Sequence, residues 1–209
     1  GNTIVVKAPS YDPMTLLVLH EMLHEAGLPA GVAQCLTGKG SVVGDCLVDD
    51  PRIACVNFTG STDAGLSIAA TAAKHLTDYK FELGGNDPFI VFEDADMDLV
   101  VKEAEDQARN NRQCCTGSKR FLVHNSLKEE FIRRLSAELD KLVIGDPMDP
   151  KVNMGPMISE RAARQVEEQV NLTVAQGARI VRGGKRNGAF YEPTILTDVA
   201  PDTDIARDM

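Results

Sequence analysis

Residues 53–65 of the chain read IACVNFTGSTDAG. The apolar run at 53–58 has Pro51 before it and Gly60 after it, which predicts a buried β-strand. The segment 62–75 follows directly and predicts a helix. A strand that passes through a glycine turn into a helix is the unit from which parallel α/β sheets are built. Because a helix N-terminus presents free N–H groups and a positive dipole end, this turn suits a pyrophosphate.

The alternation of strands and helices extends in both directions along the chain. Further strands are expected at 3–7, 33–36, 88–92, 120–124, 178–181 and 193–196, and further helices at 13–27, 96–111, 127–141 and 160–176. Asp94 or Asp96 is expected to cap the helix at 96–111, and Ser159 the helix at 160–176. This order predicts an α/β fold with a doubly wound parallel sheet.

The composition is that of an ordinary globular protein, with 43% hydrophobic and 25% charged residues. Lysine and arginine total 22 against 31 acidic residues, a net charge of -9, so nucleic acid is not an expected partner. No apolar stretch approaches the length of a membrane span, and the N-terminus lacks the pattern of a secretory signal. We expect a cytoplasmic protein that does not enter a membrane.

The cysteine and histidine patterns argue against structural metal and against a disulfide framework. The five cysteines contain no C-x-x-C pair. Residues 20–24 match the zinc motif H-E-x-x-H, but Ala30 stands where the longer form of that motif has its third ligand. Catalytic zinc needs three protein ligands and only His20 and His24 are visible, so no metal is expected.

The glycine patterns give weaker information. Residues 60–65 have the G-x-x-x-x-G outline of a P-loop, but Leu66 occupies the position of the phosphate-binding lysine, which disfavours ATP hydrolysis. The glycines at 38, 40 and 44 miss the usual dinucleotide spacing by one residue. By themselves these three glycines are equally compatible with a simple loop and with a ligand-binding site.

Two segments supply groups with catalytic chemistry. Glu82 precedes Gly84 and Gly85, which places a carboxylate base beside backbone that a ligand can approach closely. Cys115 lies among amide side chains and near arginines, a setting that favours the thiolate. The simpler alternatives are a surface carboxylate at a helix end for Glu82 and a small buried hydrophobic side chain for Cys115.

Together these motifs resemble the aldehyde dehydrogenase superfamily. The resemblance rests on Lys7, residues 58–62 with Gly65, residues 82–85, the spacing Asn110-x-x-Gln113-x-Cys115, and the later landmarks at 145–147 and 155–156. Members of that superfamily are more than twice as long as this chain. The resemblance therefore implies a middle portion: residues 1–84 as the later part of an NAD(P)-binding domain, and residues 85–209 as a catalytic domain that is incomplete at its C-terminus.

The resemblance also implies a role for individual residues. Cys115 is expected to attack an aldehyde as a thiolate, Glu82 to activate the water that releases the acid, and Lys7 to bind the adenosine ribose. The remaining expected contacts to NAD or NADP are Ser10, Gly60, Ser61, Gly65 and Leu83. Ser10 stands where NAD-preferring members often carry glutamate, so the repulsion of a 2′-phosphate is absent and NADP should be tolerated.

Substrate choice follows from a further point of resemblance. Arg109 matches an arginine that resembles the carboxylate clamp of succinate-semialdehyde dehydrogenases, and residues 85–92 are similar to that subfamily. The simpler alternative is a solvated arginine at a helix end. We therefore expect oxidation of a small ω-oxo acid, and a homo-oligomer in the full-length form.

Other functions stay open at this point. Arg112 replaces the glycine that the superfamily has beside its nucleophile, which favours a catalytically impaired member that serves as a binding or assembly module. An acylating or esterase-like member would use the same thiol without net oxidation. As a fragment, the chain alone is expected to be inactive.

Overall fold

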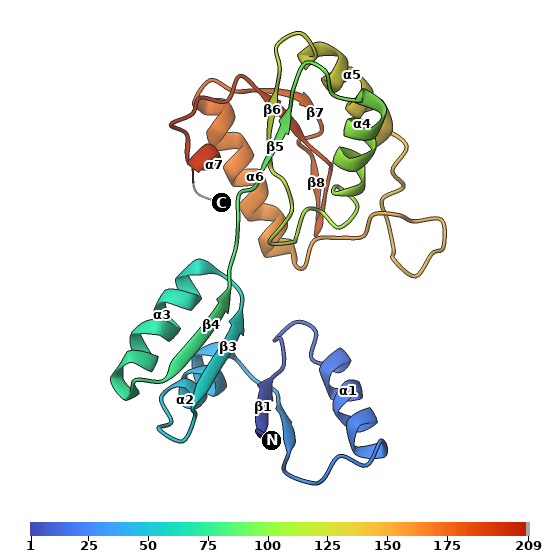
Figure 1. Ribbon diagram of the computed structural model, residues 1–209. Coiled ribbons are helices and arrows are strands. Elements are labelled where there is room, and N and C mark those ends of the chain that lie inside the picture. Colours follow the sequence, from blue (N-terminus) through green and yellow to red (C-terminus); the bar gives the residue numbers. More distant parts are fainter. Residues whose placement is uncertain (208–209) are drawn as a thin grey trace. The chain divides into compact units, whose positions relative to one another are not determined.

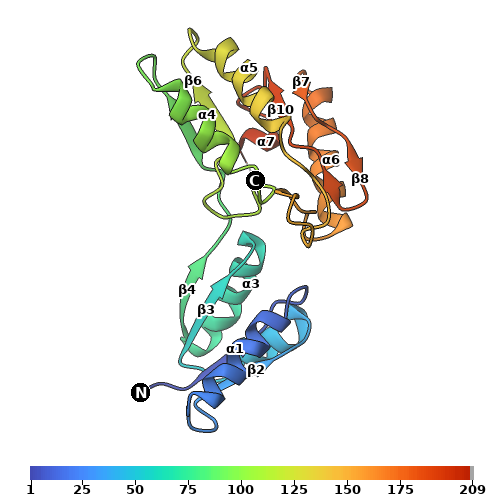
Figure 2. The ribbon, with the colours of Figure 1, turned by 90° about the vertical axis from the view of Figure 1, so that its right-hand side faces the viewer.

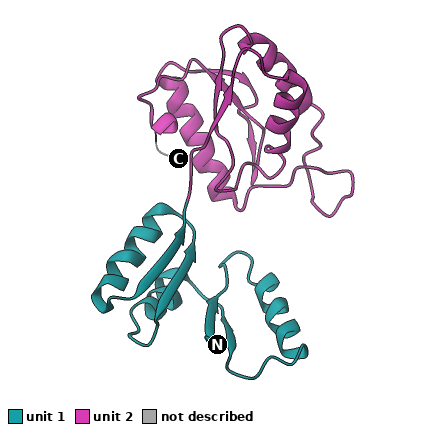
Figure 3. Ribbon diagram, viewed as in Figure 1, with its two compact units in different colours: residues 1–83 teal, residues 84–209 magenta. Residues whose placement is uncertain are grey.

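The computed structural model describes residues 1–207 and divides into two compact units, residues 1–83 and residues 84–209 (Figure 1, Figure 3). The division falls one residue before the boundary expected from the sequence, after Gly84. The assignment of cofactor binding to the first unit and of catalysis to the second stays a prediction.

The first unit consists of two β-α-β segments, and α3 lies beside β3 and β4 in both views (Figure 1, Figure 2). In the first, β1 (Ile4–Lys7) pairs in parallel with β2 (Ala33–Leu36) across helix α1 (Met14–Glu25). In the second, β3 (Cys55–Thr59) pairs in parallel with β4 (Asp78–Glu82) across helix α3 (Thr62–Ala72), which a 3-10 turn extends over Ala73–His75. Between them lie a π-helical turn at Gly40–Gly44 and the short helix α2 (Asp45–Val48).

Strand β4 was not expected from the sequence. It reads Asp-Tyr-Lys-Phe-Glu, which alternates charged with aromatic residues and is mostly exposed, so it lacks the apolar run that marked the other strands. Tyr79 and Phe81 stack with ring centroids 4.5 Å apart, as residues two apart on one face of a strand do. The alternation of charged and aromatic residues with a period of two was the signal in the sequence that could have predicted this strand. As a result, Glu82 is the last residue of a strand and not a helix-end carboxylate.

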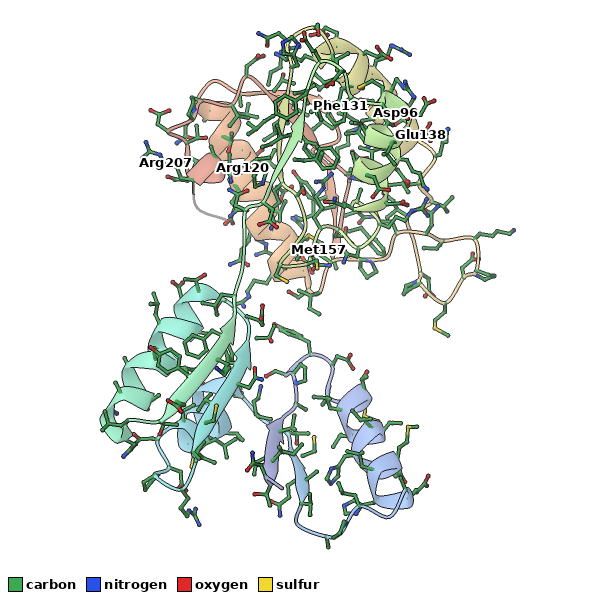
Figure 4. All side chains as sticks on the ribbon, in the orientation of Figure 1. Asp96, Arg120, Phe131, Glu138, Met157 and Arg207 are labelled. Carbon is green, nitrogen blue, oxygen red and sulfur yellow. The ribbon has the colours of Figure 1, made fainter. Side chains whose placement is uncertain are left out.

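The second unit begins with a third parallel pair. Strand β5 (Pro88–Val91) pairs with β6 (Arg120–Val123) across helix α4 (Met97–Asp106), and helix α5 (Lys128–Leu139) follows. The main core joins these elements and is formed by Val91, Met97, Val100, Val101, Ala104, Ala108, Phe131, Leu135 and Leu139. Figure 4 shows Phe131 within this layer. Burial of these apolar side chains is the main force that orders the unit.

Helix α4 is shorter than expected. Asp96 caps it, because its side chain accepts bonds from the N–H groups of Asp98 and Leu99, and this resolves the choice between Asp94 and Asp96. The helix ends at Asp106, whereas the sequence predicted a helix to residue 111, and Asn111 has φ of 58°. A residue with left-handed backbone cannot continue a right-handed helix, so the helix could not have reached Asn111.

The rest of the second unit is helix α6 with short antiparallel strands. Helix α6 (Glu160–Ala175) is capped by Ser159 as expected, since the Ser159 Oγ accepts a bond of 3.1 Å from the Ala162 N–H. Strand β7 (Arg179–Arg182) pairs with β10 (Ile195–Thr197), β8 (Arg186–Asn187) pairs with β9 (Phe190–Tyr191), and helix α7 (Asp204–Arg207) follows. These pairs are antiparallel, in contrast to the parallel pairs of the α/β segments. Over residues 1–207, no helix is both long and apolar enough to cross a bilayer.

Candidate active site

The candidate nucleophile lies in the irregular segment between α4 and β6. Cys115 and Cys114 are both exposed, which contradicts the alternative of a small buried hydrophobic residue. The Gly117 N–H donates to the Cys114 carbonyl oxygen at 3.1 Å, so the two thiols sit on a hydrogen-bonded turn. We call residues 110–118 the nucleophile turn.

Side-chain hydrogen bonds fix the nucleophile turn to its surroundings. The Gln107 Oε1 accepts from the Ser118 N–H at 2.8 Å. At the other end, the Asn111 Nδ2 donates to the Gly155 carbonyl oxygen at 3.1 Å, and the Gln113 Oε1 accepts from the Ile158 N–H at 2.8 Å. Gln107 and Asn111 were not expected as supports, because no spacing rule pairs Gln107 with Ser118 or Asn111 with Gly155.

The turn also lies close to Gly85, the second of the two glycines that follow Glu82 in the chain. A Cβ atom built on Gly85 would lie 2.9 Å from the Cys115 carbonyl oxygen, so this position requires glycine. The Lys119 Nζ donates to the Gly85 carbonyl oxygen at 2.5 Å, and the Arg120 Nε donates to the Asn86 carbonyl oxygen at 2.8 Å. Lys119 and Arg120, which follow the nucleophile turn, therefore hold in place the segment that leads from Gly85 into β5.

The two cysteines differ in their polar surroundings. The Cys114 Sγ lies 3.3 Å from the Thr116 Oγ1, and this hydrogen bond lowers the pKa of the Cys114 thiol. Hydrogen bonds to a thiolate stabilise the charged form. The lowered pKa favours Cys114 as a reactive thiol, whereas the resemblance to the superfamily motif implies Cys115 as the nucleophile.

The flanking arginines do not surround the thiols in the way the sequence suggested. Arg109 lies beyond the end of α4 and not on it, and its guanidinium pairs with Glu105 at 3.0 Å and with Asp106 at 3.3 Å. Arg112 is half-buried, and its guanidinium donates to the carbonyl oxygens of Ala104 and Ser118. Both cations are thus engaged with protein groups.

In the first unit, the candidate base lies at the carboxyl end of a parallel strand pair. Glu82 ends β4 opposite Thr59, the last residue of β3. The Gly60 N–H donates to the Glu82 carbonyl oxygen at 3.0 Å, which joins this strand end to the turn before α3. Ligands of open α/β sheets bind at the carboxyl ends of the strands, so Glu82 lies where a ligand is expected.

The cofactor candidates of the turn before α3 gather at the same edge. The Ser61 Oγ caps α3 by accepting from the Ala64 N–H at 3.3 Å. Gly65 is buried, and a Cβ there would lie 2.8 Å from the Leu83 Cδ2, so its absence lets Leu83 pack on the helix. The donors of a helix N-terminus fit a pyrophosphate, although the Asp63 carboxylate in the first turn opposes it.

Lys7 and Ser10 meet at the end of β1. The Lys7 Nζ lies 3.5 Å from the Ser10 Oγ, and this hydroxyl donates to the Gly38 carbonyl oxygen at 3.4 Å. An ammonium and a hydroxyl are donors that suit the oxygens of a ribose or a phosphate. The residues expected to bind NAD(P) therefore have the chemistry of such a site.

The H-E-x-x-H segment lies on α1, where the rings of His20 and His24 meet edge to face with centroids 4.8 Å apart. Across residues 1–207, no three side chains of His, Cys, Asp or Glu group as metal ligands would.

The sequence profile described as the aldehyde dehydrogenase family matches residues 1–208. The chain belongs to the aldehyde dehydrogenase family. This membership agrees with the α/β architecture and with the order of the motifs.

Similar members of the aldehyde dehydrogenase family act on different aldehydes, according to their names. The chain is 40% identical to a succinate-semialdehyde dehydrogenase of Escherichia coli that is named for NADP(+), and 39% identical to a glutarate-semialdehyde dehydrogenase of Pseudomonas aeruginosa. Each alignment covers 100% of the chain and 44% of the relative. The chain thus spans less than half the length of these two curated relatives.

Solved aldehyde dehydrogenases share the fold. Lactaldehyde dehydrogenase from Escherichia coli aligns with a TM-score of 0.94 and 38% identity, over 99% of this chain and 44% of that one. Betaine aldehyde dehydrogenase from Staphylococcus aureus in complex with NAD+ aligns with a TM-score of 0.95 and 33% identity, over 99% of this chain and 43% of that one.

Proposed function

We propose that the protein carrying this chain is an NAD(P)-dependent aldehyde dehydrogenase that oxidises a small ω-oxo acid such as succinate semialdehyde. The observation that carries the proposal is the exposed Cys115 thiol, in a turn packed against Gly85, three residues after Glu82 in the chain. Family membership and the semialdehyde dehydrogenases among the relatives support it.

The proposed cofactor contacts are Lys7 and Ser10 for the adenosine ribose and Ser61 with the neighbouring N–H groups for the pyrophosphate. When bound, the nicotinamide supplies the acceptor for the hydride that leaves the substrate carbon. Position 10 carries a hydroxyl that contacts the Lys7 ammonium, and no carboxylate there would repel a 2′-phosphate. We therefore propose that both NAD and NADP are used.

The chemistry of the chain's own residues divides into two stages. In the first, the Cys115 thiolate attacks the carbonyl carbon, a C–S bond forms and the carbonyl pair moves onto oxygen, where the Cys115 N–H is the proposed donor to the oxyanion. Oxidation leaves a thioester. In the second stage, Glu82 takes a proton from water, the water oxygen attacks the thioester carbon, and the C–S bond breaks to return the thiolate and release the acid.

Arg109 is the proposed partner of the substrate carboxylate. Its side chain is 45% exposed, but Glu105 and Asp106 already share the guanidinium, so a substrate carboxylate would compete with two internal ones. A fork of N–H donors can serve more than one carboxylate, because arginine has five such groups. Binding of a substrate carboxylate by Arg109 is therefore compatible with its ion pairs to Glu105 and Asp106.

A panel of aldehydes with NAD and NADP tests the proposal on the native protein. We expect reduction of either cofactor with succinate semialdehyde. Arg109→Ala should lower kcat/KM for it by more than about tenfold, since a bound substrate would cover the half-exposed guanidinium and loss of one partner of a desolvated charge pair costs about 2–5 kcal/mol. Butanal, an uncharged aldehyde of the same length, should be far less affected. An equal loss with both aldehydes would make Arg109 a structural residue. Absence of reduction with every aldehyde would contradict the proposed function.

We also propose that the protein is a homo-oligomer, by its resemblance to the superfamily. Light scattering of the native protein measures its mass in solution directly. A mass equal to a single chain would contradict this part of the proposal.

A further inference from the structure

Arg112 has a backbone conformation that side chains disfavour. Its φ is 53° and that of Asn111 is 58°, both in the left-handed region. In that region the Cβ atom crowds the following carbonyl oxygen, at a cost that glycine avoids. Arginine has no local hydrogen bond that compensates for this cost, in contrast to asparagine. Interactions of the side chain must therefore hold the residue in place.

The Arg112 side chain makes those interactions inside the second unit. Its guanidinium donates to the Ser118 carbonyl oxygen and, at 3.3 Å, to the Ala104 carbonyl oxygen. Its Cζ atom lies 4.8 Å from the centroid of the Phe121 ring, which is within the range of a cation–π contact. Burial lowers the pKa of Arg112 to about 10, so the group is still charged at neutral pH.

These partners come from both flanks of the nucleophile turn. Ala104 belongs to α4 and is fully buried, and Phe121 belongs to β6 and packs against Phe131 with ring centroids 5.5 Å apart. Ser118 follows the two cysteines, and Gln107 holds its N–H while Arg112 holds its carbonyl oxygen. The residue thus connects the segment that enters the turn to the segment that leaves it.

The backbone of Arg112 also limits the space inside the turn. A Cβ atom built on Gly117 would lie 3.2 Å from the Arg112 carbonyl oxygen and 3.6 Å from the Arg112 Cβ. The backbone segments that flank Cys115 are therefore in close contact through Arg112 and Gly117. Displacement of Arg112 would move this contact, and with it the thiol between the two residues.

We propose that Arg112 is the positioning residue of the nucleophile turn: its half-buried guanidinium holds Ala104 and Ser118 together and thereby sets the direction of the Cys115 thiol. The reference to a nucleophile rests on the proposed function. The contacts that Arg112 makes do not depend on it. Arg112 is accordingly a support of the site and not an impairment of it.

Chemical rescue tests the proposal. Arg112→Ala removes the guanidinium and leaves a cavity that guanidinium ion fits, and two charge-assisted hydrogen bonds are lost with it. We expect kcat of the native protein to fall by about tenfold or more with KM little changed, and millimolar guanidinium to restore much of it. Arg112→Lys should not restore kcat, because an ammonium is a point donor that cannot replace a planar fork. Arg133→Ala, at an exposed arginine of α5, is the matched control and should neither lose activity nor respond to guanidinium.

A second readout separates this proposal from the proposed function. In a Cys114→Ala background, the rate at which iodoacetamide alkylates Cys115 should change with Arg112→Ala and return with guanidinium. If alkylation behaves in this way while no aldehyde is oxidised, the inference stands and the proposed function fails. An Arg112→Ala variant with unchanged alkylation and kcat, or one whose losses guanidinium does not reverse, would overturn the inference.

Discussion

At the scale of single residues, the two adjacent thiols are distinguished by different kinds of observation. Cys114 has the hydrogen bond to Thr116 that lowers its pKa, whereas Cys115 has the backbone contact with Gly85. A more acidic thiol is not by itself the better nucleophile toward a bound substrate, because position decides which sulfur reaches the carbonyl. We assign the covalent step to Cys115 on position, and expect Cys114 to react with small reagents.

The hydrogen bond to Thr116 predicts the pH dependence of Cys114. In a Cys115→Ala background, Thr116→Val removes the donor that stabilises the thiolate, so the pKa of Cys114 should rise toward its ordinary value. Below the ordinary pKa of a thiol, the thiolate fraction then falls and alkylation of Cys114 slows. Well above that pKa, both proteins are ionised and the rates converge.

The measurement is the rate of iodoacetamide alkylation of Cys114 against pH, followed on its peptide by mass spectrometry. Thr116→Ser keeps the hydroxyl and is the matched control, so its profile should coincide with that of the parent protein. A profile of Thr116→Val that stays in place, or moves to lower pH, would show that the hydroxyl does not stabilise the thiolate.

At the scale of elements, the cap of α3 is also a proposed cofactor contact, so we expect changes at Ser61 to affect both stability and cofactor binding. Ser61→Ala removes the bond to the Ala64 N–H and should lower the free energy of unfolding by about 1 kcal/mol, with weaker NAD(P) binding. Ser61→Asp should keep the cap and the stability, since aspartate caps as well as serine. Its carboxylate would nevertheless repel a pyrophosphate, so cofactor affinity should fall further than with alanine.

Chemical denaturation and calorimetric titration of the cofactor measure these two effects separately. The matched control is Ser159→Ala, which removes the cap of α6 and should cost a similar free energy of unfolding without weakening the cofactor. A Ser61→Asp variant that binds NAD(P) as tightly as the parent would remove Ser61 from the cofactor site.

The sequence predicted the elements whose apolar periodicity and capping residues were strong. Strand β3, helix α3 and the cap at Ser159 are of this kind, because a buried face or a first-turn donor requires a particular residue at a particular spacing. Strand β4 was missed because an exposed strand has no such face, and α4 was extended too far because its polar end resembles a continuing helix.

The candidate site was predictable in its motifs but not in its supports. The residue types pointed to Glu82 and Cys115 as candidates, their roles are implied by the resemblance to the superfamily, and these roles stay predictions. The hydrogen bonds of Gln107 and Arg112 to Ser118 join residues whose contact depends on how the turn folds. Arg112 in particular was interpreted as a disruption of the turn, because a sequence gives no direction for a side chain.

At the scale of the whole molecule, the residues proposed to bind the cofactor lie in the first unit, and the proposed nucleophile lies in the second. The match over residues 1–208 shows the family and leaves the substrate undetermined. Relatives of similar identity are named for succinate semialdehyde, glutarate semialdehyde and lactaldehyde, and the chain covers 44% of each. Because these names differ in the aldehyde and not in the reaction, the central claim is the proposed covalent step at Cys115.

Trapping of the acyl-enzyme tests that claim most directly. Glu82→Gln should slow hydrolysis of the thioester, so rapid-quench mass spectrometry of the native protein with succinate semialdehyde and NAD(P) should show an acyl mass that accumulates. Trypsin leaves both cysteines in one peptide, residues 113–119, so the matched pair adds Cys114→Ala or Cys115→Ala to the Glu82→Gln variant. The account predicts that the adduct persists with Cys114→Ala and disappears with Cys115→Ala. The reverse pattern, or no adduct with turnover unchanged, would contradict it.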